Sequence, residues 1–369
     1  MYDSSAAFEP EVRNRACRDM MRTSGSRHSC AVSKRGVVGG PMARLVAGFG
    51  TSHSTMLFSS RENWQAMFDH VDSRAPIYDF EGKPRSFEDL LKSTPASASS
   101  KISAAAQAER HRQTMDAMDR LLSAITATKL DVLVIVGDDQ REIFGDECRP
   151  ALAVYYGDSI RNAPAPAEPT SSWYLQDQRK RMEDKHERFY PCHAGLGTHI
   201  AAGLTDRGFD VTAMKSLKGE QFEGHAYSFI HRRFMPDGPI PIVPIMLNTY
   251  YPPNQPSPTR CFDLGTAIRG LIDNFPDDLR VGIMASGGLS HFLVNEELDR
   301  HVIEALQRKD HDALKALPAK ALLSGSSEIR NWIAVAAAVG ALKLDWISYV
   351  PGYRSRALTG VGLCFAHWH

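Results

Sequence analysis

The sequence lacks the features that mark membrane, secreted and nucleic-acid-binding proteins. No run approaches the roughly 18 apolar residues that a membrane span requires, and the amino terminus has no apolar stretch of the kind found in secretory signals. Lys plus Arg (43) equals Asp plus Glu (43). Because the net charge is zero, no overall field recruits nucleic acid or an anionic membrane surface, and we expect neither partner.

Cysteine is scarce and scattered. The six cysteines form no CxxC pair and no dense group: Cys17, Cys30, Cys148, Cys192, Cys261 and Cys364. This spacing argues against a disulfide framework and against a structural zinc site, so we expect a reducing, cytoplasmic setting. What the chain does have is length and apolar content, since 369 residues, 43% of them hydrophobic, can bury a large core.

Two regions of the chain differ in composition. Residues 1–41 scatter arginines among Ser, Gly and Ala without a sustained period, which predicts a loosely ordered amino-terminal extension. From Met42 the chain leads into the apolar residues 45–50 (LVAGFG), which are typical of a first core strand. We therefore predict one folded domain over residues 42–369.

Apolar strands alternate with helical segments along this domain. Residues 131–136 (DVLVIV) and 280–285 (RVGIMA) are typical of strands covered on both faces. Residues 103–128 repeat apolar side chains at helical spacing, which predicts a helix with one face in the core. Prolines interrupt the apolar run 239–247, which predicts a strand near a sheet edge. The alternation predicts a three-layer α/β domain, with a central, mostly parallel or mixed sheet flanked by helices.

Several polar side chains that could carry chemistry follow predicted strand ends or lie in nearby loops. They are His53, Asp138, Asp139, Gln140, His225, His291 and Glu328. The carboxyl ends of strands in α/β folds are where ligands collect. Each residue alone also has an ordinary explanation, as a cap, a tight turn or a helix-terminus carboxylate worth under about 1 kcal/mol. Their combination is therefore the stronger signal.

In their order along the chain, these residues resemble those of class III extradiol ring-cleavage dioxygenases of the protocatechuate 4,5-dioxygenase β-subunit type, a family that includes gallate and 3-O-methylgallate dioxygenases. The resemblance covers nearly all of residues 42–345, apart from a longer connection between His53 and Asp131. The most specific stretches are 259–265 (TRCFDLG), 275–279 (FPDDL), 286–291 (SGGLSH), 295–299 (NEELD) and 324–328 (SGSSE), with Trp332.

Carried over position by position, the resemblance implies a role for four residues. His53 matches the family's first iron-binding histidine, Glu328 its iron-binding carboxylate, His291 its catalytic acid/base and His225 a second active-site histidine. It implies Fe(II) as cofactor and O₂ as co-substrate, and it makes residues 42–369 the catalytic domain. Two histidines and one carboxylate leave open positions on Fe(II) for substrate and O₂, and histidine is suited to proton transfer near neutral pH.

The position of the family's second iron-binding histidine is occupied by Gln140. An amide oxygen is a poorer ligand for Fe(II) than imidazole, so three arrangements stay open. Gln140 could bind through its oxygen, or Asp138 or Asp139 could take its place. Alternatively, a histidine of the following helical region, His193 or His199, could supply the missing nitrogen. We favour the strand-end loop, because the fold places it beside His53.

The resemblance predicts a ring-opening oxidoreductase acting on a catechol- or gallate-type aromatic acid. Arg141 and the pair Tyr250-Tyr251 are weaker candidates for contacts with the substrate's carboxylate or ring. The family also suggests a homodimer, with a small helical partner subunit as a further possibility. The competing hypothesis is a non-catalytic or altered-metal member of the same fold that binds a small molecule or a protein.

Overall fold

The centre of the fold is a mixed sheet of nine strands. The computed structural model describes residues 40–67, 77–236 and 238–369, so the extension predicted over residues 1–41 lies almost entirely outside the described residues. The strands run in the order β11-β13-β1-β10-β4-β9-β5-β8, with β12 paired to β13. Their bounds are β1 Arg44–Thr51, β4 Val132–Asp138, β5 Leu152–Tyr155, β8 Thr212–Met214, β9 Ile242–Leu247, β10 Arg280–Ser286, β11 His291–Leu293, β12 Leu344–Tyr353 and β13 Thr359–Trp368.

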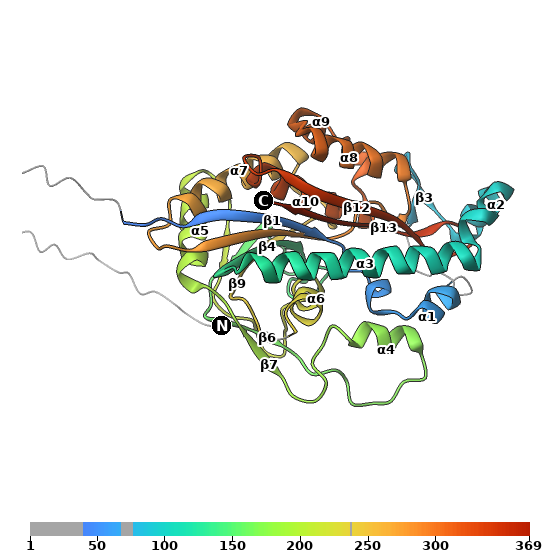
Figure 1. Cartoon of the computed structure of the whole chain (residues 1–369), viewed down its shortest axis with the longest axis horizontal. Helices are drawn as coiled ribbons and strands as arrows, with labels where there is room; N and C mark the ends of the chain where they lie inside the picture. Colours follow the sequence, from blue (N-terminus) through green and yellow to red (C-terminus); the bar gives the residue numbers. More distant parts are fainter. Residues whose placement is uncertain (1–39, 68–76, 237) are drawn as a thin grey trace, which may run out of the picture. The chain divides into compact units, whose positions relative to one another are not determined.

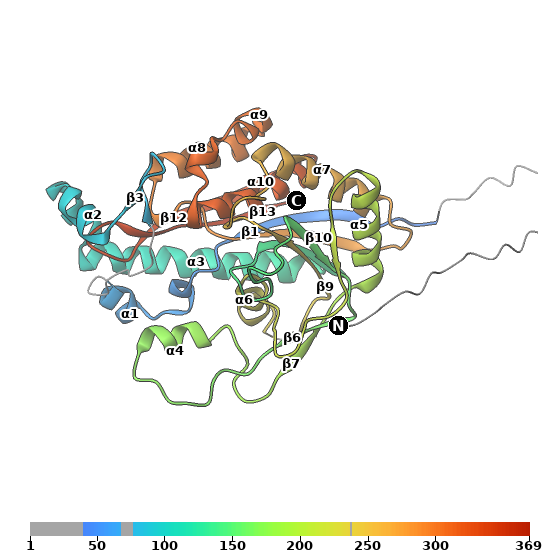
Figure 2. The ribbon, with the colours of Figure 1, turned by 180° about the vertical axis from the view of Figure 1, so that it is seen from behind.

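Helices cover both faces of this sheet, as Figures 1 and 2 show from opposite sides. Side chains of a strand alternate between its two faces. In β4, Val132, Val134 and Val136 pack with α5, α7, α8 and α10, whereas Leu133 and Ile135 pack with α3 and α6. The predicted three-layer α/β fold with a mixed sheet is confirmed.

The helices and the minor strands complete the described chain. The helices are α1 Arg61–Ala66, α2 Phe87–Ser93, α3 Ala104–Thr128, α4 Trp173–Arg179, α5 Ala194–Asp206, α6 His225–Phe234, α7 Pro258–Asp273, α8 Glu296–Arg308, α9 His311–Lys315 and α10 Ile329–Ala338, with short 3₁₀ turns η1 Thr55–Phe58, η3 Ala96–Ile102, η4 Ala319–Ala321 and η5 Ser324–Glu328. Two small sheets pair β2 Ile77–Tyr78 with β3 Pro84–Arg85, and β6 Ser159–Asn162 with β7 Arg188–Pro191. Among the described helices, none combines the length and apolar character of a membrane span.

The strand predicted near a sheet edge lies inside the sheet, and that prediction is wrong. β9 pairs in parallel with β4 on one side and antiparallel with β5 on the other. Pro244 is tolerated because the ladder with β5 includes only residues 245–247 of β9. The proline therefore lies just beyond that ladder, where its missing N–H leaves no unpaired partner in β5.

Three parallel strands end level with one another, and this alignment creates the site. Thr51 of β1 lies opposite Ser286 of β10, and Ala285 of β10 lies opposite Val136 of β4. The loops that follow these strands therefore start side by side along one edge of the sheet. This is the edge at which open α/β sheets bind ligands.

Helix α10 holds the loop that follows β10 in place. The indole N–H of Trp332 donates to the backbone oxygen of Gly287 at 2.9 Å, and the Asn331 side-chain amide donates to the backbone oxygen of Ser286 at 2.8 Å. The Trp332 ring fills the space that a side chain at Gly50 would need. Buried hydrogen bonds and close packing together hold the loop after β10 in one position.

Two glycines of α7 test how closely this layer packs. A Cβ at Gly265 would overlap the backbone carbonyl of Ala334 in α10, whereas a Cβ at Gly270 meets nothing within 4 Å. We expect Gly265→Ala to lower the free energy of unfolding by about 1–3 kcal/mol through overpacking. Gly270→Ala should raise it by about 0.5–1 kcal/mol, because alanine favours the helix. Denaturant unfolding measures both, and equal effects at the two positions would contradict the packing described.

Candidate active site

A cavity of about 690 Å³ opens at the edge where the parallel strands end. Residues from distant parts of the chain line it, among them His53, Gln140, His225, His291 and Glu328. These five predicted site residues, which lie far apart in the sequence, thus share one cavity. Its walls also carry aromatic rings, including those of Phe58, Phe229 and Phe292, which suit a flat apolar ligand.

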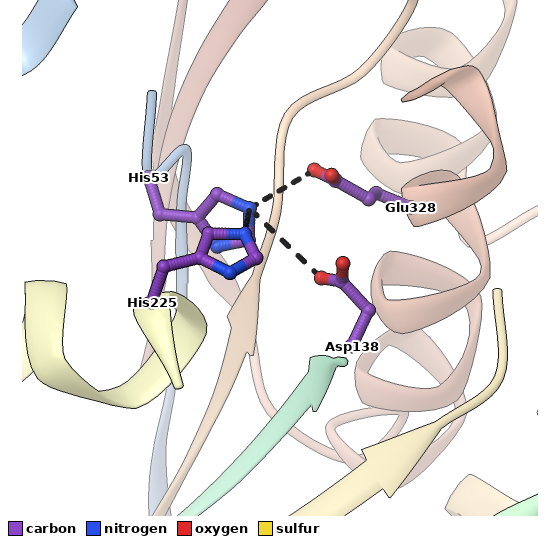
Figure 3. A group of neighbouring side chains, drawn as sticks. All are labelled: His53, Asp138, His225 and Glu328. Atoms are coloured by element: carbon purple, nitrogen blue, oxygen red, sulfur yellow. Dashed lines mark hydrogen bonds and ion pairs between the residues drawn. The ribbon is translucent and has the colours of Figure 1, made fainter. Parts of the chain in front are cut away.

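Four buried side chains converge at the floor of this cavity (Figure 3). His53 follows β1, Asp138 ends β4, His225 begins α6 and Glu328 ends η5, and one potential ligand atom from each lies within 4.8 Å of all the others. His53 Nε2 is 3.3 Å from Glu328 Oε2, 3.2 Å from His225 Nε2 and 3.9 Å from Asp138 Oδ1. Imidazole nitrogens and carboxylate oxygens in one cluster are suited to hold a divalent transition metal.

The hydrogen bonds of His53 fix which of its nitrogens faces the cluster. The Ser286 hydroxyl donates to the backbone oxygen of Ala226 at 2.7 Å. Its oxygen is therefore left to accept from His53 Nδ1, 3.0 Å away. Because Nδ1 carries the proton in this arrangement, Nε2 presents its lone pair to the cluster. Burial opposes protonation of this ring, yet the carboxylates of Glu328, Asp138 and Glu142 together outweigh that effect and raise the pKa of His53.

His225 is held in the same way by Glu142. Its Nδ1 and its backbone N–H lie 2.6 and 2.9 Å from Glu142 Oε2. Although burial favours the neutral acid, the neighbouring His225 holds the pKa of the Glu142 carboxyl at about 2, and burial lowers the pKa of His225. The pair therefore consists of a carboxylate and a neutral imidazole that donates through Nδ1, which leaves the lone pair of Nε2 directed at His53.

Glu328 is ionised and held by donors on several sides. The backbone N–H of Gly288 donates to its Oε2 at 2.8 Å and the Tyr250 hydroxyl donates to its Oε1 at 2.8 Å. Burial opposes ionisation, but His291 and His53 hold the pKa of Glu328 well below its usual range. Gly287 permits this close approach, since a Cβ there would lie 2.9 Å from Glu328 Cβ.

Asp138 and Gln140 lie together at the end of β4. Asp138 Oδ1 has no hydrogen-bond partner among the described residues, and burial together with the charge of Glu328 raises the pKa of this carboxyl to about 8. Gln140 Nε2 lies 3.2 Å from Asp138 Oδ2, 3.2 Å from Glu328 Oε1 and 3.3 Å from His225 Nε2. The ionised Glu328 carboxylate only accepts hydrogen bonds, so the amide nitrogen, not the oxygen, faces Glu328 Oε1.

His291 faces the cavity beside this cluster. Its Nδ1 is 2.8 Å from the backbone oxygen of Leu289, which makes Nδ1 the donor, and its Nε2 lies 3.3 Å from the Tyr250 hydroxyl and 3.1 Å from Glu328 Oε1. Gly325 lies against the ring, because a Cβ there would overlap it. The Nε2 atom of His291 is thus the one that reaches the cavity.

The other candidate residues lie outside the cluster. The Asp139 carboxylate accepts hydrogen bonds from the backbone N–H groups of residues 141–144 and so turns back on its own loop. His193 caps the start of α5, and His199 lies 3.1 Å from the backbone oxygen of Leu271. Arg141 stacks on Tyr251 with 4.9 Å between the guanidinium carbon and the ring centroid. Of this group only Tyr251 lines the cavity.

Three site residues were not found from the sequence. Glu142 holds His225, and Arg181 and Arg354 line the cavity. Glu142 lies two residues after Gln140, and this proximity is the one signal in the sequence that could have identified it. Its contact with His225, 83 positions away, is formed only in the folded chain. No spacing in the sequence marks the two arginines.

Comparisons with known proteins identify the family of most of this chain. Residues 100–365 match the family described as the catalytic LigB subunit of aromatic ring-opening dioxygenase. The chain belongs to this family, the class III extradiol dioxygenases that the sequence resembled. The chain is also similar to gallate dioxygenase of Pseudomonas putida, with 32% identity over 102 residues. That match spans 27% of this chain and 28% of the relative.

The buried acid Asp138 predicts how the stability of the metal-free protein depends on pH. Its pKa is raised to about 8 from 3.8, so between these values the folded state binds more protons than the unfolded state. The free energy of unfolding should therefore fall as pH rises from 6 to 8, by at most about 1.4 kcal/mol per pH unit. The raised pKa of His53 acts in the same direction.

Urea unfolding with a chelator present, at several pH values, measures this slope. Asp138→Asn should flatten it, because the variant removes the titrating group. Asp146→Asn is the control, since Asp146 is exposed and the pKa of its carboxyl is lowered by Arg149 and Arg141. An unchanged slope in Asp138→Asn would contradict the raised pKa.

Proposed function

We propose that the protein is a ferrous-iron-dependent extradiol dioxygenase that opens the ring of a catechol- or gallate-type aromatic acid with O₂. The observation that carries this proposal is the convergence of two imidazoles and two carboxylates at the floor of an aromatic-walled cavity that also holds His291. Membership of a ring-opening family supports the reaction class, and the partial likeness to a gallate dioxygenase supports the substrate class.

The donor set fits a ferrous ion. His53 and Glu328 would hold it, and further donors are available from Asp138 and His225. The unpartnered Oδ1 of Asp138 supports this assignment, because a buried carboxylate oxygen needs a proton, a donor or a cation. When bound, ferrous iron supplies Lewis acidity toward a phenolic hydroxyl and a redox centre for O₂.

His291 would act as the acid/base. Its Nδ1 is engaged by Leu289, so Nε2 is the atom that takes a proton from a substrate hydroxyl and later returns one. The Tyr250 hydroxyl, 3.3 Å from Nε2, lies where it can orient that exchange. The close contact with Gly325 and the hydrogen bond to Leu289 keep the imidazole in place.

Substrate contacts would come from further residues of the cavity wall. Tyr250 and Tyr251 line the cavity, as do Arg181 and Arg354. A guanidinium binds a carboxylate through paired hydrogen bonds, so one of these arginines is suited to the acid group of an aromatic acid. Arg141 would act indirectly, by packing against Tyr251.

Oxygen consumption tests the proposal directly. The protein reconstituted anaerobically with ferrous iron should consume O₂ with at least one of protocatechuate, gallate, 3-O-methylgallate and catechol, and the product should absorb as a ring-opened acid. Protein treated with a chelator is the control and should consume none. Bound iron without uptake on any of the four would favour the competing hypothesis, a binding protein or an enzyme for another substrate class.

Variants at His291 separate proton transfer from metal binding. His291→Asn should lower kcat by about 10²–10⁴-fold, the usual contribution of a general acid/base, while iron content stays at the wild-type level. Gly325→Ala should lower kcat in the same way by displacing the His291 ring. Gly270→Ala, whose added Cβ would meet nothing within 4 Å, is the matched control. Loss of iron in His291→Asn would contradict the assigned role.

A further inference from the structure

The imidazoles of His53 and His225 at the floor of the cavity direct the lone pairs of their Nε2 atoms toward each other. His53 Nδ1 donates to Ser286 and His225 Nδ1 donates to Glu142, so both protons point away from the cluster. The two Nε2 atoms nevertheless lie 3.2 Å apart. Two acceptors at that distance repel each other unless a proton or a cation lies between them. Glu328 Oε2, 3.3 Å from His53 Nε2, adds a third acceptor to the same point.

Gln140 is unsuited to be a ligand at this point. Its amide carries two N–H groups, and two carboxylate oxygens, Asp138 Oδ2 and Glu328 Oε1, each lie 3.2 Å from its nitrogen. Turning the amide over would place its oxygen against the ionised Glu328 carboxylate and lose that hydrogen bond. Gln140 therefore stabilises the carboxylates and leaves the metal-binding position to another residue.

We infer that His225 is the second nitrogen ligand of the metal ion, in place of the residue at position 140, and that Glu142 positions its imidazole. The inference rests on the iron site of the proposed function and assigns one of its ligands. Two nitrogen or oxygen atoms that bind one ion with bonds of about 2.1 Å would lie roughly 3 Å apart. The observed separations of 3.2 Å between the two Nε2 atoms and 3.3 Å from His53 Nε2 to Glu328 Oε2 are close to this value.

Glu142 supplies the support that metal-bound histidines usually have. Such a histidine donates its other N–H to a carboxylate, which fixes the ring orientation and the protonated nitrogen. Here Glu142 accepts from both Nδ1 and the backbone N–H of His225. Gly224, with φ of 77°, lets the chain enter α6 this close to Glu142. The second imidazole thus comes from the start of a helix, whereas the family's comes from the end of a strand.

Counting the imidazoles on a bound metal tests the inference without measuring activity. Protein loaded with one equivalent of Cu(II) is examined by pulsed EPR, which resolves the remote nitrogen of each bound imidazole. A His369→Ala background is used throughout, because Asp345, His367 and His369 form a second group that could take up copper. We expect two imidazoles in the parent protein and one in His225→Ala. A chelator competition with Zn(II) should show an affinity loss larger than about 100-fold.

Two further variants complete the experiment. Glu142→Gln should keep two imidazoles and weaken Zn(II) binding by about 10–100-fold, the usual cost of losing a ligand's hydrogen-bond partner. His231→Ala is the matched control, since His231 is another buried histidine of α6 with a carboxylate partner, Glu223 Oε2, 2.7 Å from its Nδ1. It should keep two imidazoles and the parent affinity for Zn(II).

Each outcome bears on one claim. A single imidazole in the parent protein, no metal bound at all, or unchanged spectra and affinity in His225→Ala would overturn the inference. An equal loss in His225→Ala and His231→Ala would overturn it too, because disruption of α6 would then explain both. Two imidazoles without O₂ uptake on any aromatic diol would leave the ligand assignment standing and overturn the proposed function. A single imidazole together with O₂ uptake on an aromatic diol would overturn the ligand assignment and leave the proposed function standing.

Discussion

The burial of two carboxylates beside each other is the constraint on which the site depends. Asp138 and Glu328 are both buried, and moving charged groups out of water costs several kcal/mol each unless other groups compensate. Part of the compensation is built into the chain, through the Gly288 N–H, the Tyr250 hydroxyl and the Gln140 amide. The remainder comes from a proton on Asp138, whose pKa is raised to about 8, or from positive charge on an imidazole or a metal ion.

The fold supplies the rigidity that such an arrangement needs. Three parallel strands end level, so the loops carrying His53, Asp138 and Gly287 start from one rigid edge. Trp332 then holds the loop after β10 from the helical layer behind it. Side chains that repel one another stay together only where their backbone cannot relax. The stability of the layers is therefore what keeps the acceptors converged.

The sequence predicted the parts of this structure that depend on local pattern. Continuous apolar runs identified the central strands, and the order of His53, His291 and Glu328 along the chain placed them in one cavity. The prolines led to the wrong prediction that β9 lies near a sheet edge. A strand inside a sheet can contain a proline where the ladder with its neighbour stops short, and the length of that ladder depends on the neighbouring strand. The orientation of the Gln140 amide and the pairing of His225 with Glu142 depend on contacts across 85 and 83 positions, which no local pattern records.

The proposed ligand set changes the charge of the site. Two neutral imidazoles and two carboxylates around a divalent ion are net neutral, whereas two imidazoles and one carboxylate leave one positive charge. Positive charge at the metal lowers the pKa of a bound hydroxyl, so a neutral centre lowers this pKa by a smaller amount than a positive one. Hydrogen bonds from Gln140 to both carboxylates draw charge away from the centre and offset part of this difference. The rest of the deprotonation then falls to His291, whose Nε2 reaches the cavity beside the Tyr250 hydroxyl and Glu328 Oε1.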